Sequence, residues 1–222
     1  MNFKPIIIVA GEPNSIFFEI FFKSLKKQKF KSPLILIASH KLLLLQMKKL
    51  KYKKNINLLD KKNIKIKSLS KISINLINVN YDPKLAFEKI SSKSNNYIKN
   101  CFSVANKLLN TGISSKLING PISKKCFLHK NYPGMTEYIA EKNNVKKKAM
   151  LIYNKSLSVC PLTTHVPLKN VSKKINKKNI LEKVILINSF YKTYRKFKPK
   201  IAILGLNPHC ESTNKFNEDE KL

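Results

Sequence analysis

The sequence has a single arginine, Arg195, among its 44 basic residues, so lysine supplies nearly all of the positive charge. Arginine binds phosphate and guanine through a planar fork of donors, and a nucleic-acid surface almost without it would be unusual. The lysines are also spread along the whole chain instead of forming one patch. The net charge of +32 therefore does not indicate a specific nucleic-acid partner. A basic nucleic-acid binder, which would show steeply salt-dependent binding, stays as an alternative.

Cysteine and long apolar runs are scarce as well. Cys101, Cys126, Cys160 and Cys210 stand far apart with no C-x-x-C pair, which excludes the pattern of a secreted disulfide framework or of a zinc ribbon. The apolar run Ile6–Ala10 is too short for the core of a signal peptide or for a membrane span. We therefore expect a soluble, cytoplasmic protein with no membrane contact.

Short apolar runs alternate with longer stretches of helical periodicity, which predicts an α/β fold with a mainly parallel sheet covered on both faces. Strands are expected at Ile6–Ala10, Leu34–Ala38, Ile72–Val79, Lys116–Asn119, Ala149–Tyr153, Leu157–Leu162 and Ile201–Leu204. Helices are expected at Ile16–Gln28, Lys41–Leu50, Lys84–Leu109, Thr136–Asn143 and Asn179–Phe197. The apolar residues of the last helix that should face the sheet are Ile180, Val184, Ile187 and Phe190. Lys51–Lys71 shows little apolar periodicity and is expected to be a solvated excursion.

Glycine is rare too, with five residues, and this bears on the first loop. The segment Gly11-Glu12-Pro13-Asn14-Ser15 follows a predicted strand, but it has one glycine where a dinucleotide-binding G-x-G-x-x-G fingerprint needs three. The favoured interpretation is a plain turn into a helix that Ser15 caps. The alternative is a loop that presents backbone N–H groups and a carboxylate near an anionic ligand.

A second turn, after the strand expected at residues 116–119, contains a glycine, a serine and a lysine. Gly120 permits unusual backbone angles, and Ser123 can cap the helix that follows. Lys124 would then lie at a helix N-terminus, where a phosphate meets both an ammonium group and free amides. The alternative is a turn with an incidental lysine.

The segment Tyr132–Glu137 is a tight turn followed by the start of a helix. Thr136 is the expected N-cap of that helix. Its hydroxyl or the nearby amides could also hold a substrate, and the two roles are compatible.

Two histidines follow predicted strands in similar settings. His165 lies in the segment Thr-Thr-His-Val-Pro-Leu, and His209 closes the segment Gly-Leu-Asn-Pro-His. Open α/β sheets hold ligands past the carboxyl ends of their strands, and imidazole is a common ligand of zinc and similar ions. Two ligands do not complete a metal site. A Cys/His cluster that adds Cys160 and Cys210 is an alternative, although a plain buried thiol is the favoured interpretation of Cys160.

Five segments, taken in this order, resemble the 4-hydroxythreonine-4-phosphate dehydrogenase family of vitamin B6 biosynthesis. They are GEPNSIFFEI (Gly11–Ile20), INGPISK (Ile118–Lys124), YPGMTEYIA (Tyr132–Ala140), LTTHVPL (Leu162–Leu168) and GLNPH (Gly205–His209). The resemblance runs from Ile6 to about Glu220, and the last three segments are the more specific ones.

The resemblance implies a homodimeric, NAD-dependent oxidoreductase with a three-layer α/β/α fold like that of isocitrate and isopropylmalate dehydrogenases. It also implies two lobes around a cleft, an N-terminal lobe of about residues 1–120 and a central lobe of about residues 121–222. The family oxidises the alcohol of 4-phosphooxy-L-threonine. The resulting β-keto acid then loses carbon dioxide to give 3-amino-2-oxopropyl phosphate.

The resemblance further implies roles for individual residues. Three histidines hold a divalent metal in this family, the third coming from the other subunit, and His165 and His209 fall on the first two. Histidine ligands suit zinc, with cobalt, manganese or magnesium as alternatives. Met135 and Thr136 fall on the family's substrate-binding pair, and Lys124 is a further candidate for the substrate phosphate.

Three departures from the family pattern modify these expectations. Ser15 and Phe17 replace glycines of the family, so the first loop lacks that backbone freedom. Met135 replaces a histidine, which keeps open a related dehydrogenase that acts on threonate or erythronate phosphate. Family members also extend beyond residue 222, into a part that carries the third metal histidine and much of the NAD site. We therefore expect a C-terminally shortened chain with weak or absent activity, and an inactive remnant is a further alternative.

Overall fold

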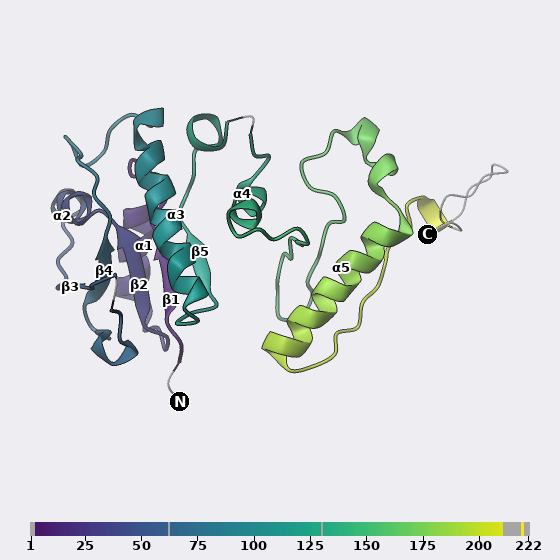
Figure 1. Ribbon diagram of the computed structural model, residues 1–222, viewed down its shortest axis with the longest axis horizontal. Helices are drawn as coiled ribbons and strands as arrows, with labels where there is room; N and C mark the ends of the chain where they lie inside the picture. The colour runs from purple at the N-terminus through teal and green to yellow at the C-terminus, as the bar shows by residue number, and fades with distance from the viewer. Residues whose placement is uncertain (1–2, 62, 130, 211–218, 220–222) are drawn as a thin grey trace. The chain divides into compact units, whose positions relative to one another are not determined.

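The computed structural model describes residues 3–61, 63–129, 131–210 and 219, and the chain divides into two compact units (Figure 1). Unit 1 is Met1–Asn131 and unit 2 is Tyr132–Leu222. The lobes expected at about 1–120 and 121–222 stay a prediction, because a compact unit is not by itself the lobe of an enzyme. The two units are described separately below.

Unit 1 is built on a parallel five-stranded sheet in the order β3-β4-β2-β1-β5. The strands are β1 (Ile6–Val9), β2 (Leu34–Ala38), β3 (Ile56–Leu58), β4 (Ile74–Asn78) and β5 (Leu117–Asn119). Ile7 pairs with Ile35 on one side and with Leu117 on the other, so β1 lies between an early and a much later strand. The central strands are rich in isoleucine and leucine because a sheet buried on both faces needs apolar side chains on both.

Three helices cover the two faces of this sheet. They are α1 (Phe17–Lys27), α2 (His40–Lys49) and α3 (Asn95–Asn110). Ile8 and Leu36 belong to one buried cluster with side chains of α1 and α2, whereas α3 contacts β1 and β2 and crosses in front of them in Figure 1. Since alternate residues of a strand point to opposite faces, α3 covers the face opposite to α1 and α2. Unit 1 therefore confirms the predicted α/β class with three layers.

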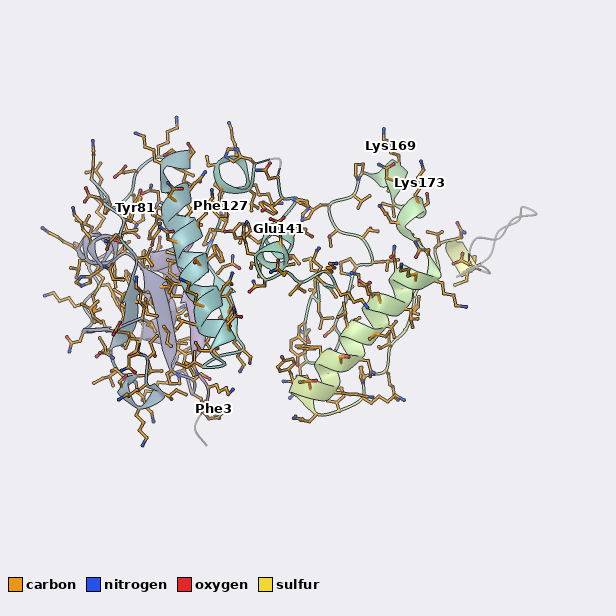
Figure 2. The ribbon with its side chains drawn as sticks, viewed as in Figure 1. Phe3, Tyr81, Phe127, Glu141, Lys169 and Lys173 are labelled. Carbon is orange, nitrogen blue, oxygen red and sulfur yellow. The ribbon has the colours of Figure 1, made fainter. Side chains whose placement is uncertain are left out.

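The described residues of unit 2 form two α-helices and several short turns. The helix α4 spans Met135–Lys142, and α5 spans Lys177–Phe190 and continues as a π-helical turn. The turns are at Leu168–Asn170, Ser172–Lys174, Tyr191–Arg195 and Pro208–Cys210. Lysine side chains project from its surface, among them Lys169 and Lys173 (Figure 2). In neither unit does a helix of the described residues combine the length and apolarity needed to cross a membrane.

The strands expected in unit 2 are absent from its described residues. Ala149–Tyr153 and Leu157–Leu162 form only one antiparallel bridge, between Ile152 and Val159, and Ile201–Leu204 is irregular. Apolar runs form strands only where they find partners to pair with, which is why β-propensity alone misleads here. The apolar residues of α5 that were expected to face a sheet are half-buried or exposed for the same reason.

Two expectations in unit 1 were also wrong. The segment Lys51–Lys71 is not a plain excursion, because it contains β3, whose Asn57 side chain donates to the side chain of Asn75 at 2.8 Å. The helix expected from Lys84 begins only at Asn95. The other helices and strands of unit 1 lie within a few residues of their predicted bounds.

Candidate functional site

In a parallel sheet all strands end at the same edge, where α/β proteins place their ligands. Loops of unit 1 leave this edge after the last residues of β1, β2, β4 and β5, namely Val9, Ala38, Asn78 and Asn119. Because β1 and β5 are neighbours in the sheet, the GEPNS and INGPIS segments leave it side by side. The structure thus brings together two segments that the sequence separates widely.

Two glycines allow these neighbouring loops to cross in contact. The N–H of Glu12 donates to the carbonyl of Pro121 at 2.9 Å, and the N–H of Gly120 donates to the carbonyl of Val9 at 2.8 Å. A Cβ on Gly120 would lie 2.1 Å from the carbonyl oxygen of Ala10, and one on Gly11, which has φ +79°, would lie 2.5 Å from that of Pro121. Gly120 is therefore needed for space, not for the unusual backbone angles that the sequence suggested.

The carboxylate of the first loop is turned inward. Glu12 is 2% exposed, and its two oxygens lie 3.0 and 3.2 Å from the hydroxyl of Ser94, which donates to them. Burial raises the pKa of Glu12, and the hydrogen bond from Ser94 partly offsets this. The loop therefore offers no free carboxylate to a ligand. Ser15 accepts from the N–H of Phe17 at 3.3 Å, but the N-cap of α1 is Ile16.

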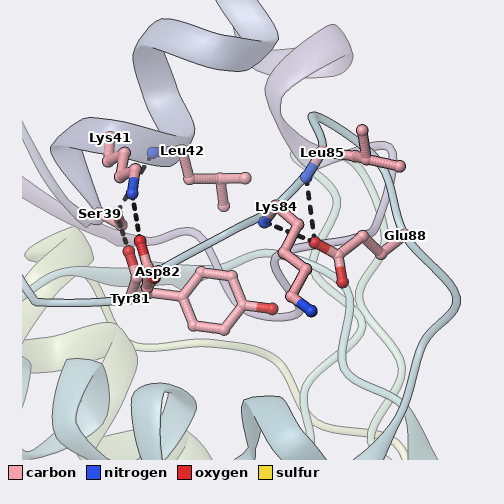
Figure 3. A network of polar contacts seen from close by, with 8 residues as sticks. All are labelled: Ser39, Lys41, Leu42, Tyr81, Asp82, Lys84, Leu85 and Glu88. Carbon is pink, nitrogen blue, oxygen red and sulfur yellow. Dashed lines mark hydrogen bonds and ion pairs between the residues drawn. The ribbon is translucent and has the colours of Figure 1, made fainter.

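A network of polar contacts holds the loop after β4 at the same edge (Figure 3). The hydroxyl of Ser39 caps α2 by accepting from the N–H of Leu42 and donates to the carbonyl of Tyr81. Lys41 forms an ion pair with Asp82, and this ammonium lowers the pKa of that carboxyl. The carboxylate of Glu88 accepts from the N–H groups of Lys84 and Leu85, which holds residues 84–88 in a turn instead of the expected helix.

The predicted cap at Ser123 is confirmed. Its side chain accepts from the N–H of Cys126 at 3.1 Å, at the start of a short π-helical turn over Lys124–Leu128. Lys124 is the first residue of that turn and is exposed to solvent. An exposed ammonium beside the loops of the sheet edge can attract a phosphate, which is the role that the sequence suggested for it.

In unit 2, the helix that carries the expected substrate pair is capped differently from the prediction. Gly134 is the N-cap of α4, so Met135 and Thr136 are its first two residues, and Thr136 is exposed instead of capping. A Cβ on Gly134 would lie 3.0 Å from a carboxylate oxygen of Glu137 and 3.1 Å from Nε2 of His165. The side chains of Glu137 and His165 therefore converge on the position where an N-cap side chain would stand.

His165 is exposed and has a positive φ of 55° in the loop after the Ile152–Val159 bridge. The hydroxyl of the preceding Thr164 donates to Glu137 Oε1 at 3.4 Å, which ties this loop to α4. Sequence reasoning did not single out Glu137. Its position three residues after the N-cap, where acidic residues favour a helix start, was the available signal.

His209 lies in the turn Pro208–Cys210, with φ 61°, and is exposed. The carboxylate of Asp219 accepts from the N–H groups of Leu206 and Asn207, at 2.7 and 3.1 Å, and so fixes the residues just before the turn. His165 and His209 both lie in turns with left-handed backbone, not past the ends of strands as predicted. The two runs expected to precede them, Leu157–Leu162 and Ile201–Leu204, do not form strands.

The described residues hold no group of three or more histidine, cysteine or acidic side chains that could bind a metal ion. The Cys/His cluster considered above is therefore not formed among them. All four cysteines are free. Burial raises the pKa of Cys160, which disfavours the thiolate needed for metal binding, and the pKa of Cys101 is raised to about 12. The exposed imidazoles of His165 and His209 are donors that suit a divalent ion, and other ligands would have to join them.

The comparisons with known proteins agree with one another. The profile of the family "Pyridoxal phosphate biosynthetic protein PdxA" matches residues 29–222. A 4-hydroxythreonine-4-phosphate dehydrogenase of Sulfurihydrogenibium sp. is 36% identical over 97% of this chain and 67% of its own length. A D-threonate 4-phosphate dehydrogenase of Salmonella typhimurium is 25% identical over 99% of this chain and 68% of its own.

The fold is shared with solved structures as well. The crystal structure of a 4-hydroxythreonine-4-phosphate dehydrogenase from Burkholderia phymatum superposes with a TM-score of 0.77 at 22% identity, over 93% of this chain and 63% of that one. The chain thus spans about two thirds of the length of these proteins. On the family profile and the Sulfurihydrogenibium relative together, the chain belongs to the family of the pyridoxal phosphate biosynthetic protein PdxA.

Proposed function

We propose that the protein acts as a 4-hydroxythreonine-4-phosphate dehydrogenase in pyridoxal phosphate biosynthesis. It would oxidise the alcohol of 4-phosphooxy-L-threonine by two electrons, with hydride passing to NAD⁺ and a proton released. The β-keto acid would then lose its carboxylate as carbon dioxide to give 3-amino-2-oxopropyl phosphate. The observation that carries this proposal is the PdxA family match over residues 29–222, supported by the printed name of the Sulfurihydrogenibium relative.

In this proposal His165 and His209 hold a divalent metal, with zinc favoured and cobalt, manganese or magnesium as alternatives. Both imidazoles are exposed and free to bind a ligand, and neutral imidazole leaves the positive charge of an ion undiminished. A bound divalent ion lowers the pKa of the substrate alcohol and stabilises the negative charge left as carbon dioxide departs. The remaining ligands would come from outside the described residues, in a cytoplasmic homodimer.

Lys124, Met135 and Thr136 would bind the substrate. Lys124 offers an exposed ammonium to the phosphate, and Thr136 offers an exposed hydroxyl on the first turn of α4. The free N–H groups of that first turn also attract negative charge. Met135, half-buried at the first position of α4, would contact the substrate without donating a hydrogen bond.

A related activity on D-threonate 4-phosphate is the second candidate. Met135 favours it, because the histidine of the usual family pattern is missing at a substrate-binding position. The Salmonella relative, whose printed name is D-threonate 4-phosphate dehydrogenase, matches 99% of the chain. The two substrates differ at the carbon beside the carboxylate, which carries an amine in 4-phosphooxy-L-threonine and a hydroxyl in D-threonate 4-phosphate. A single altered contact can distinguish these two groups.

The test is NADH formation by the intact protein with each substrate, in the presence of Zn²⁺, Co²⁺, Mn²⁺ or Mg²⁺. We expect turnover of 4-phosphooxy-L-threonine, weak in residues 1–222 alone because the third metal histidine is expected beyond them. We expect a loss of at least about a hundredfold in His165→Ala and His209→Ala. His40→Ala, which alters a histidine in unit 1, is the control and should keep its activity. Faster turnover of D-threonate 4-phosphate would favour the second candidate, and no NADH with either substrate would contradict both.

A further inference from the structure

The carboxylate of Glu137 is only half satisfied. Its Oε1 accepts from the hydroxyl of Thr164 at 3.4 Å, but its Oε2 is buried and has no hydrogen-bond partner. A buried carboxylate oxygen without a donor is costly, so such an atom indicates a missing partner with an N–H or O–H group. A nearby N–H or O–H group of unit 2 is therefore expected to donate to Oε2.

The geometry around Gly134 identifies the neighbour. The position that a Cβ of Gly134 would occupy lies 3.0 Å from Glu137 Oε2 and 3.1 Å from His165 Nε2, so both atoms face one small space. Glycine at the N-cap leaves this space open, although a serine or aspartate there would cap α4 better. Since Gly134 has no side chain to occupy this position, the carboxylate and the imidazole face the same space.

A carboxylate beside an imidazole has a known chemical use. A neutral imidazole carries one N–H donor and one acceptor nitrogen, and the partner of the N–H decides which nitrogen remains free. A carboxylate that accepts this hydrogen fixes the ring and makes the other nitrogen a better metal ligand. Thr164 helps, because its bond to Glu137 Oε1 holds the backbone next to His165 against α4.

We propose that Glu137 is a positioning residue for His165. Its Oε2 accepts the hydrogen of one ring nitrogen, fixes a single tautomer and leaves the other nitrogen to bind a metal ion. The metal-binding part rests on the proposed function of His165, whereas the fixed tautomer does not. Glu137 itself touches neither metal nor substrate in this arrangement.

The direct test is ¹⁵N NMR of the imidazole rings in the intact protein at about pH 8, above the ordinary imidazole pKa. The resonances of His165 are assigned by their loss in His165→Gln. We expect one dominant tautomer of His165 in the unaltered protein and a mixture of both in Glu137→Ala. Two tautomers already interconverting in the unaltered protein would overturn the proposal, whether or not the variant folds.

A second measurement follows Co²⁺ binding by visible absorption. Glu137→Gln should weaken Co²⁺ affinity by about tenfold, as is common when the carboxylate partner of a metal-bound histidine is altered. Glu141→Gln, one turn further along the same helix, is the matched control and should leave affinity and tautomer unchanged. If His165→Ala leaves Co²⁺ affinity unchanged, the metal role of His165 fails, and the tautomer result still decides the role of Glu137. An unchanged tautomer in a folded Glu137→Ala contradicts the positioning role.

Discussion

At the scale of single residues, the crossing of the loops after β1 and β5 depends on the missing side chain of Gly120. We expect Gly120→Ala to lower the free energy of unfolding by at least about 2 kcal/mol, because its Cβ would collide with backbone that cannot move aside. Urea unfolding followed by circular dichroism measures this loss.

Gly112→Ala is the control for that prediction. Gly112, unlike Gly120, has a positive φ, of 74°, but a Cβ there meets nothing within 4 Å. Gly112→Ala should lower the free energy of unfolding by only about 1 kcal/mol, because alanine is strained in left-handed backbone. A loss at Gly120 no larger than the loss at Gly112 would contradict the prediction, because the close approach of the loops would then add no cost.

The buried carboxyl of Glu12 makes stability depend on pH in an unusual direction. Burial raises its pKa in the folded protein, so the folded state binds this proton more tightly than the unfolded state. Stability from this group is therefore lost as pH rises from about 4.5, near the unfolded pKa, through the raised folded value. Glu12→Gln cannot titrate, so its stability relative to the unaltered protein should increase with pH across this window.

Urea unfolding at intervals from about pH 4 to pH 8 measures that difference. Glu19→Gln, a partly exposed glutamate of α1, is the control and should show no comparable trend. A difference that stays constant or falls with rising pH would contradict the raised pKa of Glu12.

At the scale of elements, the helix start at Ser39 links α2 to the loop after β4. Ser39→Ala removes the cap of Leu42 and the bond to the carbonyl of Tyr81 together. We expect the free energy of unfolding to fall by about 2 kcal/mol. This is the upper end of the range for losing an N-cap side chain, because the hydrogen bond to Tyr81 is lost as well. Ser103→Ala, an exposed position within α3, should be neutral or slightly stabilising in the same assay, because alanine favours helix. A loss at Ser39 no larger than that at Ser103 would refute the link.

Elements with a clear apolar pattern in the sequence were predicted correctly, whereas elements fixed by long-range contacts were not. The strands β1, β2 and β4 and the helix α1 were foreseen because continuous isoleucine or phenylalanine patterns require burial. The strand β3 was missed because it spans only Ile56–Leu58, too few residues to show a periodic apolar pattern. The loop at residues 84–88 was taken for helix because long-range contacts decide it, including the bond from Glu88 N–H to the side chain of Asn14.

The candidate site was predicted only as far as local sequence allows. Ser123 was identified as a cap because its serine-to-helix spacing is a local signal. The closeness of Glu137, Gly134 and His165 depends on tertiary contact, so no local pattern could show it. The roles of Lys124, Met135, Thr136, His165 and His209 stay predictions until the experiments above are made.

At the scale of the whole molecule, the apolar core is distributed unequally. Among the described residues, Tyr138 and Ala140 are the only buried apolar side chains of unit 2, and all the others belong to unit 1. We therefore predict that residues 1–131 alone give a cooperative urea transition, whereas residues 132–222 alone do not. Circular dichroism of the two fragments measures this. A cooperative transition in the second fragment, or none in the first, would contradict the prediction.

The position of β1 between β2 and β5 has a consequence for protein synthesis. The ribosome makes β1 before both of its neighbours in the sheet, and one of them, β5, is complete only after residue 119. Until then the nascent chain presents an open apolar strand edge, the kind of surface that invites aggregation and chaperone binding. The pairing of β1 is thus completed only after β5 has been made, and the loops at Gly11 and Gly120 can cross only when translation has passed Pro121.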